Sequence, residues 1–154
     1  MEILTEIWKY ILVFVLGAIP WVEIAVVIPV SIVAGMNPWL TGLMAFAGNL
    51  STVYLLILFF DKFKQWRNRR KGEEGQQSKR SQRAVRLWNR YGLPGMSLLG
   101  PLLIGSHIAV FIAILFGARK MGALIWMTVS LAIWTVTFTV ASVYGFDLIK
   151  YLRG

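Results

Sequence analysis

The sequence predicts an all-α integral membrane protein made of two inverted repeats, each a Pro-broken re-entrant helical hairpin followed by a transmembrane helix. Three observations support this fold class. Apolar residues make up 57% of the 154 residues, charged residues only 15%, and the mean hydropathy is +0.64, which is more apolar than one small soluble core requires. The positive charges gather in one loop. Pro and Gly interrupt two apolar segments that occupy corresponding places in the two halves.

Residues 1–60 form the first predicted repeat. Its first apolar segment, residues 7–35, contains Pro20 and Pro29, and proline both removes an amide donor and disfavours helix at the preceding residue. Backbone groups freed in this way must be satisfied by protein or by water in a cavity, so we expect a broken or re-entrant helix. The apolar stretch 39–60 follows, and it is long enough to cross a bilayer, which takes about 20 residues.

A basic loop at residues 61–90 joins the repeats. It carries eleven Lys and Arg residues against three acids, or about +8 of the total charge of +9, and such loops stay on the cytoplasmic side. The apolar spacing at residues 78–91 predicts an amphipathic helix lying on the anionic cytoplasmic leaflet. On it, Arg83, Arg86 and Arg90 either gather a phosphorylated lipid headgroup or simply anchor the helix. A single juxtamembrane cluster argues against nucleic acid as a partner.

Residues 91–154 form the second predicted repeat. Its apolar segment, residues 92–117, is again interrupted, and we expect Pro101 and Gly105 to shape a second hairpin as Pro20 and Pro29 shape the first. The stretch 121–144 is the second predicted span. Paired broken segments in corresponding positions of two halves are typical of transporter binding sites.

Counting positive charges leaves two membrane topologies open. If both broken segments are re-entrant, the loop cations and the pair Arg119 and Lys120 lie inside, and Lys9, Lys150 and Arg153 lie outside. If both broken segments cross fully, the two chain ends lie inside and only Arg119 and Lys120 lie outside. The second arrangement satisfies the positive-inside rule equally well. We favour the re-entrant form because of the paired breaks.

Several short motifs resemble the small multi-drug export protein family. They are P-x-x-E-x-x-x-x-x-P, formed by Pro20, Glu23 and Pro29, the pair Gly48-Asn49 in the next span, the basic loop, YGLPGMSLLGPLL at residues 91–103, and FGARK at residues 116–120. The likeness extends over nearly the whole chain and, through that family, to the DedA-type (VTT-domain) membrane proteins, which share paired re-entrant hairpins. One stretch departs from the family pattern, because residues 101–107 read PLLIGSH where a Pro-Leu-Pro-Gly-Thr-Gly-like run is expected.

The resemblance implies a multi-pass protein of the cell membrane, the bacterial inner or plasma membrane. The expected function is proton-coupled export of small amphipathic or lipid-linked substrates, such as a cationic drug or a lipid phosphate. Two alternatives stay open: a lipid scramblase or flippase for polyprenyl-phosphate-type lipids that works without coupling, and a membrane scaffold that transports nothing.

Glu23 is the only acid within the long apolar stretches and is the first candidate site residue. An ionised acid near the middle of the membrane costs about 2.5–3.5 kcal/mol on insertion scales, so it should face a polar cavity or stay protonated. This favours a role in carrying a proton or binding a cation. The alternative is a carboxylate near the interface that caps a half-helix, where the helix dipole stabilises it.

His107 and Asn49 complete the expected site. His107 is the only histidine and can change charge near neutral pH, so it is a candidate proton partner for Glu23, or else a neutral side chain bonded to a backbone carbonyl near Pro101. Asn49 is expected to orient the site, since a buried amide needs partners. No cysteine and one histidine leave no ligand set for a metal and no nucleophile set for an enzyme, and we expect no cofactor. Two spans and two hairpins have too little surface to enclose a transport pathway, so we expect a homo-oligomer.

Overall fold

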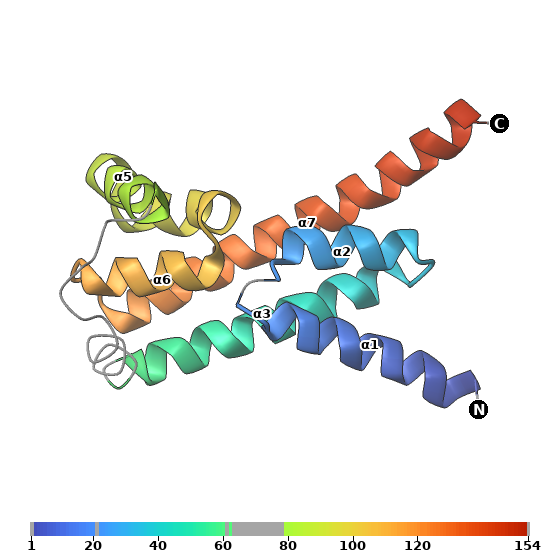
Figure 1. The fold of residues 1–154 in the computed structure, drawn as a ribbon, viewed down its shortest axis with the longest axis horizontal. Helices are drawn as coiled ribbons and strands as arrows, with labels where there is room; N and C mark the ends of the chain where they lie inside the picture. The colour runs from blue at the N-terminus through green and yellow to red at the C-terminus, as the bar shows by residue number, and fades with distance from the viewer. Residues whose placement is uncertain (1, 21, 61, 63–78, 154) are drawn as a thin grey trace. The chain divides into compact units, whose positions relative to one another are not determined.

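All regular structure in the part of the chain that the computed structural model describes is α-helical (Figure 1), which confirms the all-α class. The described residues are 2–20, 22–60, 62 and 79–153. The helices are α1 (Glu2–Ala18), α2 (Ile24–Val33), α3 (Pro38–Leu58), α5 (Lys79–Leu103), α6 (Ser106–Leu115) and α7 (Lys120–Arg153). They form two compact units, one of residues 1–51 with 131–154 and one of residues 52–130. We call these the first and the second unit.

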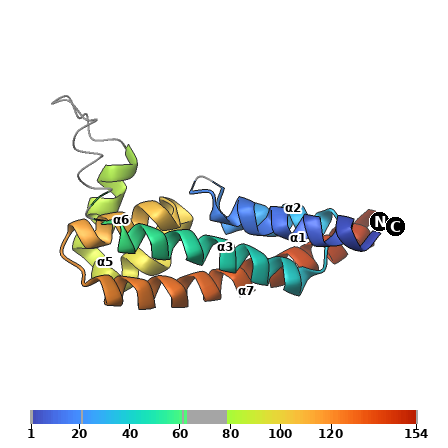
Figure 2. The same cartoon turned by 90° about the horizontal axis from the view of Figure 1, so that it is seen from below.

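In the first unit, α1 and α2 form a helical hairpin. They contact one another, diverge from the turn that joins them in Figure 1, and overlap in the perpendicular view of Figure 2. Between them the amide of Val22 donates to the carbonyl of Ile19 at 3.0 Å, and Pro20 lies inside this turn, where its fixed φ is favourable. α1 and α2 are therefore joined by a turn that contains Pro20, and the re-entrant form of this hairpin stays a prediction.

Pro29 does not interrupt the helix, contrary to our expectation. It lies inside α2, which continues from Ile24 to Val33. Its ring removes the amide that would bond to the carbonyl of Ala25, yet the helix continues beyond it to Val33. Prolines inside apolar helices are tolerated in membrane proteins.

Close approach of helices explains Gly17 and also Gly48, which belongs to the Gly48-Asn49 motif. A Cβ atom on Gly17 would lie 2.7 Å from the carbonyl oxygen of Ala45, and one on Gly48 would lie 2.1 Å from that of Phe14. Both glycines are helical, and their missing side chains let the backbones of α1 and α3 touch. Small residues at helix contacts are the usual packing device in lipid.

In the second unit, α5 has two parts separated by a kink at Gly92, where φ is 61° and ψ is −153°. The part before the kink is helical from Lys79, and the amphipathic character predicted for residues 78–91 stays a prediction. Its Trp88 stacks on Phe116 with ring centroids 5.5 Å apart, so part of the apolar face packs on the protein itself. The exposed Arg90 lies over the ring of Tyr91. The side chains of Arg83 and Arg86, and residues 63–78 of the basic loop, lie outside the described residues.

The second hairpin is formed by α5 and α6, which contact one another and are separated by a sharp turn at Gly105 (Figure 1). Gly105 has φ of 98°, a value that side chains disfavour, and glycine is the residue that adopts it without strain. Pro101 lies inside α5 instead of at the turn. Gly100 allows the hairpin to close, because a Cβ there would lie 2.4 Å from the Cβ of Ala109.

The two halves of the chain repeat one plan of elements. α2 and α6 each have 10 residues, and each ends in the same cap. In the first, the amides of Gly35 and Met36 bond back to the carbonyls of Ile32 and Ser31; in the second, Gly117 and Ala118 bond back to Ile114 and Ala113. Gly35 and Gly117 take φ of 86° and 96°, as this cap requires. A long helix begins three residues after each glycine.

Those two long helices coincide with the predicted spans. Within the described residues, two helical stretches are long and apolar enough to cross a membrane, Pro38–Leu58 and Lys120–Gly145. Only 39% and 33% of their most apolar windows are buried inside the protein. Exposed Val, Ile, Leu and aromatic side chains cover the remaining surface of both. A core helix of a soluble protein would have this apolar surface buried, and a lipid-facing helix would not.

Candidate functional site

His107 lies at the start of α6, directly after the turn at Gly105, in the second unit. It is only 6% exposed, and the helix around it is otherwise apolar except for Ser106. A titratable ring placed in such a setting must have its hydrogen bonds satisfied by the protein. The turn at Gly105 produces this position, because it ends α5 and directs the first residues of α6 into the unit.

Both ring nitrogens of His107 have hydroxyl partners. Nε2 lies 2.8 Å from Oγ1 of Thr52 on α3, and Nδ1 lies 3.1 Å from Oγ of Ser106. A hydroxyl can donate or accept, so a neutral ring can accept from one hydroxyl and donate to the other, and a protonated ring can donate to both. Hydroxyl partners of this kind can bond to the ring in either protonation state. These partners are side-chain hydroxyls and not the backbone carbonyl that we had considered as an alternative.

Glu23 is half-buried in the first unit and occupies the residue before α2. Its carbonyl accepts the first two hydrogen bonds of the helix, from Val26 at 2.9 Å and from Val27 at 3.2 Å. Its carboxylate makes no capping hydrogen bond to the helix amides. The acid is thus at a helix N-terminus, where the dipole favours negative charge, and its side chain does not cap the helix.

Asn49 is fully buried in the middle of α3, also in the first unit. The expected group of Glu23, Asn49 and His107 is thus divided between the two units, with the acid and the amide in one and the imidazole in the other. An approach of Glu23 to His107 stays a prediction.

Sequence reasoning missed two members of the histidine site. Thr52 was visible only as a polar residue three positions after Asn49 on the same face of the span. Ser106 is adjacent to His107 in sequence, which was the one local signal available. Within the described part of the chain, no group of three or more His, Cys, Asp and Glu side chains is placed to hold a metal ion.

The comparison with protein families agrees with this architecture. The family described as "Putative small multi-drug export protein" matches residues 23–137 of the 154, from Glu23 to the second span. The chain belongs to this family. Neither a curated protein nor a solved structure matches the chain. The matched region includes the short helices α2 and α6, His107 with both of its hydroxyl partners, and all of α3.

Family membership and the exposed apolar helices together establish a membrane protein of the small multi-drug export type. The name of the family is consistent with a transporter.

Proposed function

We propose that this small multi-drug export protein is a proton-coupled exporter of small amphipathic substrates, in which His107 binds and releases the proton, and that it is not an enzyme. The observation that carries the proposal is the bonding of His107, whose two ring nitrogens both face hydroxyls in a buried site. Hydroxyl partners can hydrogen-bond to either charge state of the ring, which a proton carrier needs. An intramembrane ionisable residue is by default a candidate for a proton or ion pathway.

We propose Glu23 as the second proton-handling group. It is the only acid of α2 and its flanking turns, and its carboxylate does not cap the helix. Transporters of several folds have their ion and substrate groups at the ends of broken helices. Asn49 is fully buried on α3, the helix that follows α2, and we propose that it orients polar groups in the same unit.

The proposed membrane arrangement is an inverted repeat with re-entrant hairpins, with the loop at residues 61–90 on the cytoplasmic side of the cell membrane. Helix length supports it. At about 1.5 Å per residue, the 10 residues of α2 or of α6 extend only about 15 Å, which is half of the roughly 30 Å hydrocarbon core. A helix of that length followed directly by a glycine turn enters a bilayer and does not cross it.

The test is proton flux into proteoliposomes that contain a pH-sensitive dye, under an imposed substrate gradient. We expect flux that depends on an amphipathic cationic or neutral drug in the wild type. We expect it to be lost in His107→Gln and Glu23→Gln, since an amide cannot carry the proton. Glu6→Gln is the matched control, because Glu6 is an exposed acid of α1 paired with Lys9, and it should retain wild-type flux.

Two results would contradict the proposal. If neither the wild type nor any variant shows proton flux under any gradient, the protein does not couple transport to protons. If a fluorescent polyprenyl-phosphate analogue moves between leaflets without proton flux, the result would favour the lipid scramblase. In that alternative, Arg83, Arg86 and Arg90 would bind the lipid phosphate, and a relation to DedA-type proteins would explain the substrate. We further propose a homo-oligomer, to be tested by native mass measurement in nanodiscs.

A further inference from the structure

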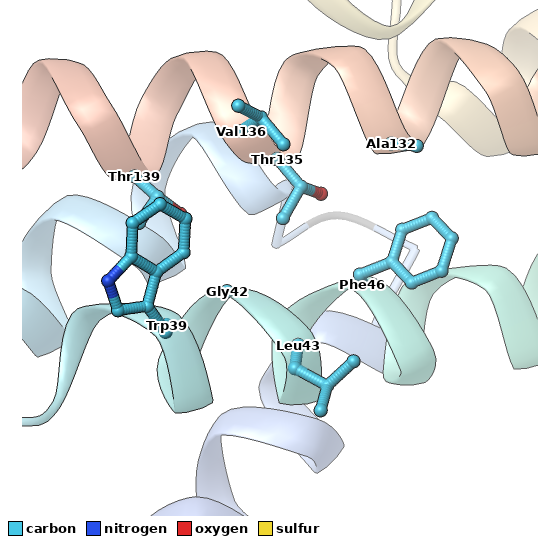
Figure 3. Close-up of a pocket in the computed structure, with 8 residues that line it drawn as sticks. All are labelled: Trp39, Gly42, Leu43, Phe46, Ala132, Thr135, Val136 and Thr139. Atoms are coloured by element: carbon cyan, nitrogen blue, oxygen red, sulfur yellow. The ribbon is translucent and has the colours of Figure 1, made fainter.

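A pocket of about 220 Å³ lies between α3 and α7 in the first unit (Figure 3). The two helices line it with the same spacing. α3 contributes Trp39, Gly42, Leu43 and Phe46, and α7 contributes four residues from Ala132 to Thr139 at the same intervals, one face of each helix. Neither set includes a charged side chain.

Gly42 keeps the floor of this pocket open. A Cβ atom there would lie 2.7 Å from Oγ1 of Thr139 and 3.4 Å from a methyl carbon of Thr135. The absence of a side chain therefore lets two threonines of α7 approach the backbone of α3 directly. The aromatic rings of Trp39 and Phe46 lie on either side of this point along α3 (Figure 3).

The threonine hydroxyls are the unusual feature of the pocket. Thr135 is 9% exposed and Thr139 is 2% exposed, and neither hydroxyl has a hydrogen-bond partner. Three other hydroxyls of α7, those of Thr128, Thr137 and Ser142, bond to backbone carbonyls four residues earlier in the same helix, whereas that of Ser130, which does not line the pocket, also has no partner. Figure 3 shows the oxygen of Thr135 directed into the space between the two helices. Two buried donors in an apolar setting, both unused, indicate a ligand that supplies the missing bonds.

We propose that this pocket binds a compact uncharged aromatic molecule of one or two fused rings, with a hydroxyl or carbonyl group that hydrogen-bonds to Thr135 and Thr139. Its size supports this class. A cavity of about 150 Å³ accepts benzene, and drug-sized ligands occupy roughly 300–1,000 Å³, so 220 Å³ lies between the two. The proposal rests on the proposed export function, since such a molecule would be its substrate.

The open side of the pocket indicates how the molecule arrives. Trp39 is 69% exposed, Leu43 60% and Val136 54%, and all three belong to helix faces that are apolar outside the pocket as well. In a membrane these faces contact lipid, so a molecule dissolved in the bilayer reaches the pocket sideways. Amphipathic aromatic compounds partition into bilayers, and the two hydroxyls would distinguish them from acyl chains.

The test is photolabelling of the full chain in nanodiscs with a trifluoromethyl-diazirine derivative of phenol, with the labelled residues mapped by mass spectrometry. We expect labels within residues 39–46 and 132–139, and we expect excess 2-naphthol to compete about tenfold better than naphthalene, which lacks the hydroxyl. Thr135→Val and Thr139→Val should each lower labelling about fivefold. Thr137→Val, an exposed threonine of the same helix, is the matched control and should change nothing.

A second variant guards against misfolding of the threonine variants. Ala132→Leu extends from an exposed position into the pocket and should block labelling while the helix contacts persist. Labels elsewhere, or equal competition by naphthalene and 2-naphthol, would overturn the proposal and leave an apolar groove that lipid fills. Labelling as expected without any substrate-driven proton flux would retain the pocket and refute the exporter. If substrate-driven proton flux is lost in His107→Gln but unchanged in Thr135→Val and Thr139→Val, the proposed role of the pocket is refuted and the exporter is not.

Discussion

Substitution of Gly48 by alanine tests the packing of α1 on α3, on which the first unit depends. The added Cβ would lie 2.1 Å from the carbonyl oxygen of Phe14 and 3.1 Å from the amide nitrogen of Ala18. Both are backbone atoms of one helix, so no side chain can move aside, and α1 must shift by about 1.4 Å to restore an ordinary contact distance of about 3.5 Å. Glu23 follows α1 in the same hairpin, so this shift would also disturb the proposed proton site.

The expected magnitude follows from two opposing effects. Overpacking of this kind destabilises by about 1–3 kcal/mol, and here the upper part of the range applies because the contact is with backbone. Replacement of a helical glycine by alanine recovers up to about 1 kcal/mol of helix propensity. The net loss is about 2 kcal/mol, or roughly 4–8 °C in melting temperature for a chain of this size.

The assay is thermal melting in detergent, followed by fluorescence-detected gel filtration. Gly145→Ala is the matched control, since its Cβ would meet nothing within 4 Å, and it should melt at or slightly above the wild-type temperature. A Gly48→Ala protein as stable as the Gly145→Ala protein would refute the reasoning, because α1 and α3 could not then touch at this glycine.

Three further predictions concern the histidine site, a helix cap and the topology. Thr52→Val removes the hydroxyl 2.8 Å from Nε2 of His107 and should lower the unfolding free energy by about 0.5–2 kcal/mol in chemical denaturation, with Thr52→Ser close to wild type. Asn37→Ala removes the side-chain oxygen that accepts the amides of Trp39 and Leu40, both at 3.1 Å, and should cost about 1 kcal/mol in the same assay. Because the chain has no cysteine, a cysteine introduced by Ala118→Cys can be labelled alone. An impermeant maleimide added outside cells should not react with this cysteine if the second hairpin is re-entrant. It should react if residues 92–117 cross the membrane.

The spans were predictable from the sequence, and the exact turns of the hairpins were not. An uninterrupted apolar run of sufficient length has few alternatives, so α3 and the first part of α7 begin within one residue of the predicted positions. A proline, by contrast, can lie in a turn, in the first turn of a helix or inside a helix at modest cost. Pro20 took the first role and Pro29 and Pro101 the last, and only tertiary packing distinguishes them.

The sequence shows which residue types are available for the site, but not which of them contact one another. His107 was the one imidazole available, but its partner Thr52 is 55 positions away on another helix, and no local spacing connects the two. The polar stripe of α7 shows the same limit. Its hydroxyls share one face of the helix, yet those of Thr128 and Ser142 bond to their own helix, whereas Thr135 and Thr139 line the pocket, because the choice depends on where α3 lies beside them.

The short helices α2 and α6 are alike in backbone and differ in their polar residues, and this difference bears on the proposed function. The two short helices agree in length, in cap and in distance to the following span, so the backbone design was kept in both halves. The polar residues were not kept. The residue before α2 is Glu23, whereas the residue before α6 is Gly105, and the second residue of α6 is His107, whereas the second residue of α2 is Ala25. One repeat thus supplies an acid and the other a base. A pair of identical hairpins could only repeat one proton site. In the exporter that we propose, hairpins that differ in this way would bind a proton at groups of different basicity, so that a proton could be taken up on one side of the membrane and released on the other.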